Sequence, residues 1–163
     1  PVVSKNGAWV QIVLEDGQYS GSITTDQTAA VINTAYALTY TAEISSGIAN
    51  GTPASRIVFD EAGEYMISFS AQISSTSAST VNFWFWPRVN GSDVTGSTMK
   101  NALHQNGATL VVSRSSIFDL NAGDYLEVMW AVDSTNGFLD ATAATAFAPA
   151  APSSTIAITR LQG

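Results

Sequence analysis

Residues 56–73, RIVFDEAGEYMISFSAQI, carry the pattern that decides the fold. A β-branched and aromatic run at 57–59 is followed by the turn residues of 60–63, where Gly63 can adopt a positive φ. Beyond the turn, apolar residues alternate with polar ones, and this period of two predicts a strand with one buried face. The stretch therefore predicts a strand, a tight turn and a second strand. The expected buried residues of the second strand are Tyr65, Ile67, Phe69, Ala71 and Ile73.

Residues 81–89, VNFWFWPRV, form the most apolar predicted strand. Valine and phenylalanine occupy one face, while Trp84 and Trp86 share the other, and a strand that is aromatic on both faces is covered on both. One face can fill a core, and the other needs a neighbouring subunit, a loop or a ligand. Pro87 lacks an N–H and predicts an edge or a bulge at that point. Asn90-Gly91 is a strong signal for a hairpin turn.

The rest of the chain repeats strands separated by turns that contain glycine. Residues 125–132 place Leu126, Val128 and Trp130 on one predicted buried face, and residues 138–148 are either a strand or an extended loop. No helical period of useful length is present, so about ten short strands predict an all-β sandwich or jelly roll. The other predicted strands cover 31–41, 44–51, 93–100, 108–120 and 155–161.

Composition limits the classes of function. The length of 163 residues suits one domain. Only 12% of the residues are charged, about half the usual share, and this favours a surface that contacts protein. The alternative is a robust domain that uses hydroxyl groups for solubility. The net charge of −7 and the absence of a basic run argue against nucleic-acid binding. Cysteine is absent, no apolar run is long enough to predict a membrane span, and the first residues lack the apolar core of a signal peptide.

No cluster of residues predicts catalysis, a metal site or a cofactor. His104 is the only histidine, lies in a polar segment and is expected to be an exposed loop residue rather than a zinc ligand or a catalytic base. The acidic pairs Asp60/Glu61 and Asp119/Asp124 flank turn glycines, where carboxylates support turns, so we expect no glycosidase pair. Tryptophans could stack on sugar, but packing in a core or an interface is the simpler expectation.

The N-terminal residues form a separate question. Residues 1–14 carry little patterned surface, yet they include apolar side chains that need cover. We expect an attachment arm that anchors the subunit to a partner or a neighbouring subunit, and the alternative is that this segment is the first strand of the sandwich. Residues 1–29 are thus assigned to the arm and first strand or strands, and 30–163 to the main domain. The expected arm residues are Trp9, Val10, Ile12 and Leu14.

Several motifs in order resemble the C1q/TNF-like jelly-roll domains of tailed-bacteriophage structural proteins, over roughly 30–163. They are Asn33-Thr34-Ala35, FDEAGEY at 59–65, NGSDV at 90–94, LNAGDYLEVMW at 120–130 and Pro152-Ser153 before the last strand. The resemblance implies a ten-strand, two-sheet jelly roll, a homotrimer with its termini near one end, and a protein that is not an enzyme and needs no cofactor. Residues 1–29 contain no collagen-like or coiled-coil pattern, so we expect the domain's own surfaces to hold the trimer.

These observations lead to two related expectations of function. The first is a trimeric protein that decorates or cements a phage capsid through the major capsid protein or another virion protein; the alternative is the tip or adaptor of a head or tail fiber that recognises host surface glycans. Either protein is assembled in the host cytoplasm and resides on the virion. A third class, a secreted carbohydrate-active enzyme, requires a carboxylate pair in a cleft. The residues expected in the core or the trimer interface are Tyr36, Tyr40, Tyr65, Phe69, Trp84, Trp86 and Trp130.

Overall fold

The computed structural model describes residues 2–5, 8–11 and 17–162. Every regular element in these ranges is a β-strand, so the all-β prediction is confirmed. The described part of the chain holds no helix with the length and hydrophobicity that a membrane crossing requires. Two strands near the N-terminus, β1 (Val2–Lys5) and β2 (Ala8–Gln11), pair antiparallel with each other and with neither of the two large sheets.

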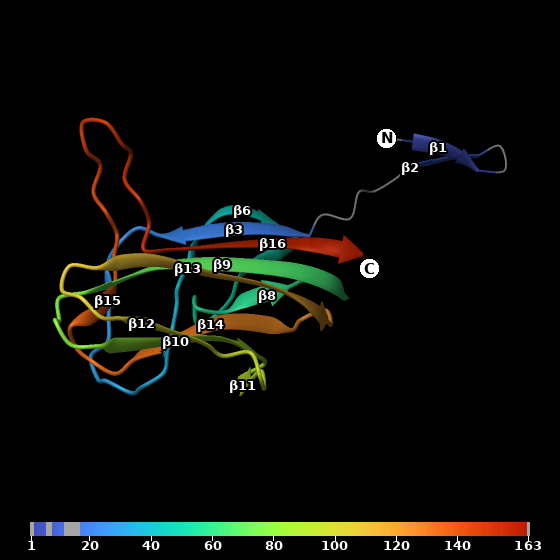
Figure 1. Cartoon of the computed structure of the whole chain (residues 1–163). Coiled ribbons are helices and arrows are strands. Elements are labelled where there is room, and N and C mark those ends of the chain that lie inside the picture. The colour runs from blue at the N-terminus through green and yellow to red at the C-terminus, as the bar shows by residue number, and fades with distance from the viewer. Residues whose placement is uncertain (1, 6–7, 12–16, 163) are drawn as a thin grey trace.

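The other strands form two antiparallel sheets that lie one over the other (Figure 1). The first sheet contains β5 (Tyr36–Ala37), β7 (Ile48–Asn50), β8 (Ile57–Phe59), β10 (Val81–Val89), β11 (Ser92–Asp93), β12 (Met99–Leu103) and β14 (Tyr125–Val132). The second contains β3 (Gln18–Ile23), β4 (Gln27–Thr28), β6 (Thr41–Ser46), β9 (Gly63–Ser75), β13 (Thr109–Leu120), β15 (Gly137–Leu139) and β16 (Ser154–Gln162). In the first sheet β10 lies between β12 and β14; in the second, β9 lies between β13 and β16.

The turn after Phe59 carries the chain from one sheet to the other. β8 pairs with β7 and β14, whereas β9 pairs with β13, β15 and β16, so the two predicted strands do not form a hairpin. Across the turn, the rings of Phe59 and Tyr65 meet edge to face with centroids 4.7 Å apart, and the Tyr65 hydroxyl donates to the Glu61 carbonyl at 2.8 Å. The aromatic pair therefore ties the two sheets together where the chain crosses.

The core lies between the sheets and contains the predicted alternating residues. Tyr65, Ile67, Phe69, Ala71 and Ile73 of β9 are all buried, which confirms the face predicted from the period of two. Leu126, Val128 and Trp130 of β14 are buried as predicted, and so are Val81, Phe83 and Phe85 of β10. Phe69 and Phe85 meet across the core with ring centroids 5.8 Å apart.

Residues 31–41 are not the strand that their alternation predicts. Only β5 and the first residue of β6 are strand in this segment. Asn33 adopts a φ of 55°, in the left-handed region that turns the chain, and Leu38 then donates its N–H to the Val128 carbonyl at 2.9 Å. The alternating pattern has another origin: Leu38 and Tyr40 are both buried in the core, although neither belongs to a strand.

The hairpin after β10 forms as predicted, and Pro87 is accommodated at a gap in pairing. Val89 pairs with Ser92, and the two turn residues between them, Asn90 and Gly91, have φ values of 50° and 79°. On one side of Pro87, β14 pairs without interruption. On the other side, the β12 and β11 ladders leave out residues 86–87, and there the Pro87 carbonyl accepts a hydrogen bond from the Val94 N–H at 3.1 Å. The missing N–H therefore interrupts no ladder, because the strand has an edge at that point only.

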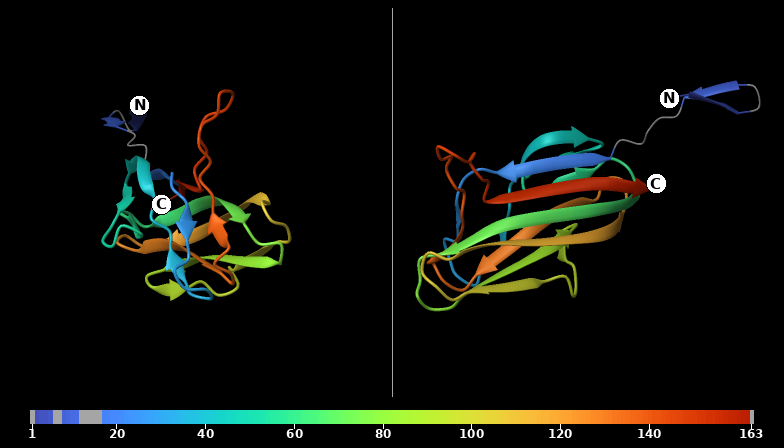
Figure 2. Two further views of the ribbon diagram at one scale, coloured as in Figure 1. Left: turned by 90° about the vertical axis from the view of Figure 1, so that its left-hand side faces the viewer. Right: turned by 45° about the horizontal axis from the view of Figure 1, so that its top comes forward.

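Several predicted boundaries move. Residues 108–120 and 155–161 correspond closely to β13 and β16. The strand predicted at 93–100 is wrong over most of its length, because β11 ends at Asp93, residues 94–98 are not strand, and β12 begins only at Met99 and runs through Leu103. The stretch 138–148 begins as β15 and continues as a loop that projects from the sandwich and is closed by the bridge Thr142–Ala151 (Figure 2). Sixteen strands are assigned in the described residues against about ten predicted, because several are only two to four residues long.

Candidate functional site: an aromatic groove and a serine face

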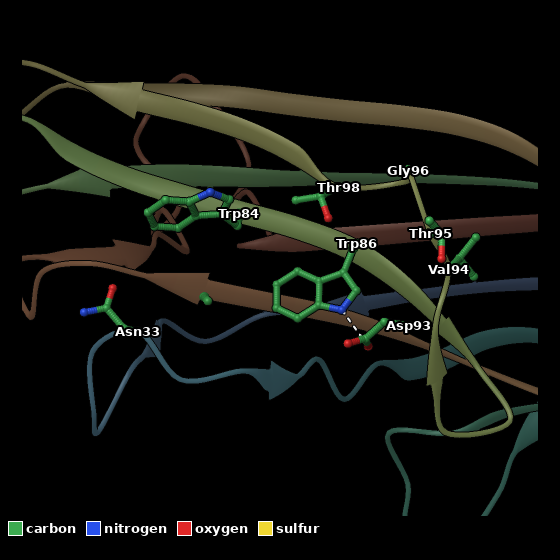
Figure 3. Close-up of a pocket in the computed structure, with 9 residues that line it drawn as sticks. Asn33, Trp84, Trp86, Asp93, Val94, Thr95, Gly96 and Thr98 are labelled. Carbon is green, nitrogen blue, oxygen red and sulfur yellow. Dashed lines mark hydrogen bonds between the residues drawn. The ribbon is translucent and has the colours of Figure 1, made fainter.

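A groove lies on the outer face of the first sheet, away from the core. Trp84 and Trp86 project from β10 over the neighbouring strand, where Trp84 is in register with Ala131 and Trp86 with Met129. The groove has a volume of about 510 Å³ and both indole rings are partly exposed in it (Figure 3). The loop after β11 supplies the other wall. The lining residues are Asn33, Trp84, Trp86, Asp93, Val94, Thr95, Gly96, Thr98 and Ala131.

Asp93 holds one end of the groove in place. Its Oδ1 accepts a hydrogen bond from Trp86 Nε1 at 2.8 Å and another from Arg88 Nε at 2.7 Å. These contacts, that from the Arg88 guanidinium first and that from the indole second, lower the pKa of the Asp93 carboxyl below its ordinary value. The Trp86 ring is consequently fixed by its N–H while its face stays open to the groove.

The rim of the groove is polar. Thr95, Thr98 and Asn33 are exposed, and their side chains make no hydrogen bond within the described residues. Lys100 stands opposite Trp84 on β12, with its Nζ 5.4 Å from the centroid of the indole. An apolar floor with hydroxyl, amide and carboxylate groups around it is the usual composition of a small-molecule site.

The second sheet presents a different outer surface, which we call the serine face. It is formed by the side chains of β3, β9, β13 and β16 that point away from the core, together with Ile44 of β6. In register, Ser70 of β9 lies between Ser113 and Thr155, and Ser68 of β9 lies between Ser115 and Ala157. Two hydroxyl pairs bridge the strands: Ser68 with Ser115 at 2.7 Å and Ser70 with Thr155 at 2.8 Å.

Large apolar side chains flank these hydroxyls. Ile117 is 63% exposed and Val111 is 61% exposed, and both point outward from β13. Met66, paired with Ile117, and Ile44, paired with Ser20, are also exposed. No lysine or arginine is among the residues in register on the outer side of β9, β13 and β16. The serine face is thus partly apolar and lacks cations in these ladders, and its outward carboxylates on β9 and β13, Glu64 and Asp119, are in register with each other at one end.

The predicted site residues separate into three groups. Tyr40, Tyr65, Phe69 and Trp130 are buried in the core, and Tyr36 is partly buried against Trp130 with ring centroids 6.2 Å apart. Trp84 and Trp86 lie outside the core and line the groove. In the predicted attachment arm, Trp9 and Val10 belong to β2, whereas Ile12 and Leu14 lie outside the described residues.

The histidine and the carboxylates that are candidates for catalysis or metal binding make structural contacts. His104 is exposed, and its Nδ1 is 2.9 Å from Thr80 Oγ1. Asp124 accepts from the Asn121 N–H and from the Asn90 side chain, each at 2.7 Å, and these contacts lower the pKa of its carboxyl. Glu61 forms an ion pair with Arg160 at 2.5 Å. Within 2–5, 8–11 and 17–162, no group of three His, Cys, Asp or Glu residues could hold a metal ion.

Sequence reasoning found the aromatic side of the groove but not its other wall, and it did not identify the serine face. Asn33 is distant from Trp84 in sequence, and only the fold brings it to the groove, whereas Asp93 reaches Trp86 across the predicted Asn90-Gly91 hairpin. A signal for the serine face was present: serines alternate with apolar residues at 66–70, and Ser113 and Ser115 recur at a spacing of two on the next strand, with no lysine at the outward positions. A period-two strand whose outer residues are small hydroxyls indicates a face that is not simply solvated.

Comparison with known proteins supports the fold and nothing finer. No protein-family model matches the chain, and no curated protein sequence matches it. Among solved structures, murine APRIL at pH 8.5 is similar with a TM-score of 0.56 at 11% identity, covering 88% of this chain and 98% of that one. Murine APRIL at pH 5.0 gives a TM-score of 0.53 at 10% identity, with the same coverage. The fold of this protein is a TNF-like jelly roll, as its motifs predicted.

Proposed function

We propose that this protein is a non-enzymatic, homotrimeric virion structural protein that decorates or cements the capsid of a tailed bacteriophage. The observation that carries the proposal is the serine face, a broad surface without cations that exposes Val111 and Ile117. The ordered motifs add support, because the resemblance that they carry is to trimeric phage domains. The TNF-like fold supports the non-enzymatic trimer but says nothing of a phage. The capsid surface is the proposed location, with the major capsid protein or another virion protein as partner.

Association through the serine face follows from its chemistry. An antiparallel sheet that faces water on one side normally carries charged residues there. Serine and threonine lose little conformational entropy on burial, and the Ser68–Ser115 and Ser70–Thr155 pairs already satisfy part of their hydrogen bonding. The exposed Ile117 and Val111 gain free energy when they are covered. The face is therefore suited to contact another copy of the domain.

The positions of the chain ends suit attachment at one end of such an oligomer. Gln18 at the start of β3 is in register with Thr159 near the end of β16, so the domain begins and ends on the same side (Figure 1). A ring of three copies would carry three N-terminal segments on that side. Linked anchors bind with a high effective concentration after the first has bound, so weak single contacts suffice.

The test of assembly is sedimentation equilibrium at micromolar concentration. The proposal expects a species of three 17.1 kDa chains, and expects Ser113→Lys/Ser115→Lys to shift it toward monomer, because burying two cations on an apolar face is unfavourable. The matched control is Phe147→Lys, which adds a cation to a side chain that is 91% exposed in the projecting loop. A monomeric wild-type protein contradicts the trimer.

The groove favours a second candidate function, the glycan-reading tip or adaptor of a head or tail fiber. Two partly exposed indoles with a polar rim resemble a ligand site more than a capsid contact. Copy number separates the two functions, because a decoration protein occurs in fixed proportion to the major capsid protein and a fiber tip in a few copies per particle. Subunit stoichiometry in purified virions, or an image of the intact particle, makes the distinction.

A further inference from the structure

We propose that the Trp84–Trp86 groove binds a neutral sugar chain. The inference rests on the proposed function only in treating the protein as one that binds rather than catalyses. It assigns the ligand class and the residues of contact: the two indoles form the platform, and Asn33, Asp93, Thr95 and Thr98 form the polar rim.

The two indoles are spaced to contact an extended ligand. Trp84 and Trp86 are two residues apart on one strand, so their side chains lie on the same face at a spacing of about 7 Å along the strand. The Trp86 indole is held by its bond to Asp93, and Lys100 lies over the Trp84 ring, so neither ring is a freely rotating surface residue. A sugar ring has one face of C–H groups and an edge of hydroxyls, which matches a flat aromatic floor and a hydrogen-bonding rim.

The rim favours a ligand that both donates and accepts hydrogen bonds. Thr95 and Thr98 offer hydroxyls, Asn33 offers an amide, and Asp93 Oδ2 is an acceptor without a hydrogen bond in the described residues. Sugar hydroxyls satisfy all of these groups. A proline-rich peptide fits the aromatic floor but lacks N–H donors for the carboxylate, and the indole N–H that would donate to its carbonyls is already bonded to Asp93.

Charge favours a neutral sugar over an anionic one. Arg88 forms an ion pair with Asp93 at 2.7 Å, so these two charges offset one another at the end of the groove. Lys100 is the remaining cation beside the rings, and the whole chain carries a net charge of −7. A sulfated or carboxylated polysaccharide would meet one local cation and a repulsive overall field.

The groove and the serine face lie on the outer surfaces of opposite sheets. A contact that covers the serine face therefore does not itself cover the groove. The large side chains with high exposure include Val111 and Ile117 of β13 but none from β10, because both tryptophans are partly buried against their neighbours.

The test uses the indole N–H signals of the ¹⁵N-labelled, full-length protein. The chain has four tryptophans, and Trp→Phe substitutions assign their four signals. The probes are neutral hexasaccharides of glucose, mannose, galactose and N-acetylglucosamine. A heparin hexasaccharide and decaproline are tested separately, as representatives of anionic sugars and proline-rich peptides. We expect at least one neutral hexasaccharide to shift the Trp84 and Trp86 signals saturably, with a Kd of about 1 mM or tighter. The signal of the buried Trp130 should not move.

Two variants complete the experiment. Trp86→Ala should weaken the sugar at least about tenfold, because stacking on an indole is lost. Phe147→Ala removes an aromatic ring that is 91% exposed elsewhere and should leave the affinity unchanged. An unshifted Trp130 signal in each variant shows that the core is intact.

Several results would overturn the inference. They are no response to any neutral hexasaccharide at about 10 mM, well above the expected Kd, equal affinity in Trp86→Ala, or shifts with decaproline or heparin alone. Sedimentation of the same samples separates this test from the proposed assembly. A monomer that still binds sugar through Trp86 would contradict the proposed trimer and support the sugar site. A trimer that binds no sugar would support the trimer and contradict the sugar site.

Discussion

At the scale of single residues, stability depends most on side chains that cross between the sheets. Phe69 from β9 reaches Phe85 from β10, with ring centroids 5.8 Å apart, and both are buried. Such a contact joins strands that no backbone hydrogen bond connects, because β9 and β10 belong to different sheets. Removing one of these rings leaves a cavity that the rigid sheets cannot collapse to fill.

Phe69→Ala should lower the free energy of unfolding by about 3–5 kcal/mol through lost transfer free energy and the residual cavity. Urea denaturation followed by tryptophan fluorescence measures the change. Met66→Ala, three residues away at a side chain that is 41% exposed, is the control and should cost far less. A loss under about 1 kcal/mol for Phe69→Ala would mean that its ring does not fill the core.

Asp124 should make the stability depend on acid pH. Its folded-state pKa is lowered by the Asn121 N–H and the Asn90 amide, so its contribution is present above the unfolded pKa of about 3.9 and is lost as the pH falls through the lowered folded value. We expect Asp124→Asn to be less stable than wild type at pH 7, with the difference shrinking below about pH 3. Urea midpoints measured from pH 7 to pH 2 test this.

The control for the acid dependence is Asp119→Asn. Asp119 is exposed and accepts no hydrogen bond in the described residues, so its substitution should change the urea midpoint at pH 7 little. If the urea midpoints of Asp124→Asn and wild type differ by the same amount at every pH, the turn contacts of Asp124 do not depend on its protonation.

At the scale of elements, the N-terminal strands stand apart from the sandwich. β1 and β2 pair only with each other among the strands of the structure, and the second sheet begins with β3 at Gln18. The alternative in which residues 1–14 form a strand of the sandwich gains no support from this pairing. The segment remains the proposed attachment element.

Deleting residues 1–14 should leave folding and assembly intact and abolish binding to particles. The physical reason is that no ladder of either large sheet includes β1 or β2. Circular dichroism, sedimentation and co-sedimentation with particles that lack the protein measure the three properties. A truncated protein that misfolds, or that still binds particles, removes the attachment role. A matched control carries Phe147→Ala in the full chain.

At the scale of the whole molecule, low charge and the serine face link stability to assembly. The domain exposes several large apolar side chains on one face of the second sheet, and a stable monomer of this size normally covers such a face with charge. If association covers them, the folded state is stabilised by mass action, and monomer stability alone understates the stability of the assembly.

The midpoint of thermal unfolding should therefore rise with protein concentration. Scanning calorimetry between about 1 and 100 µM measures this, because unfolding of a trimer to separate chains depends on concentration and unfolding of a monomer does not. In Ser113→Lys/Ser115→Lys the dependence should disappear. A wild-type midpoint that stays constant across this range contradicts obligate assembly.

The sequence by itself determined the strand class, the buried faces and the main turns. The alternation at 65–73 and at 126–130 identified side chains that are in fact buried, and Asn90-Gly91 identified its hairpin. These features depend on neighbours along one strand, where side chains alternate between faces and a turn needs particular φ values. The order of several such motifs also predicted the jelly roll.

Only the tertiary structure decided which strands share a sheet and what the outer faces form. It separated β8 from β9, turned residues 31–41 at Asn33, and brought Asn33 to the tryptophans of β10. It also aligned serines from strands far apart in sequence into one face. A repeat of two residues states that a side chain points outward but not what lies beside it, since that depends on strand pairing over long sequence distances.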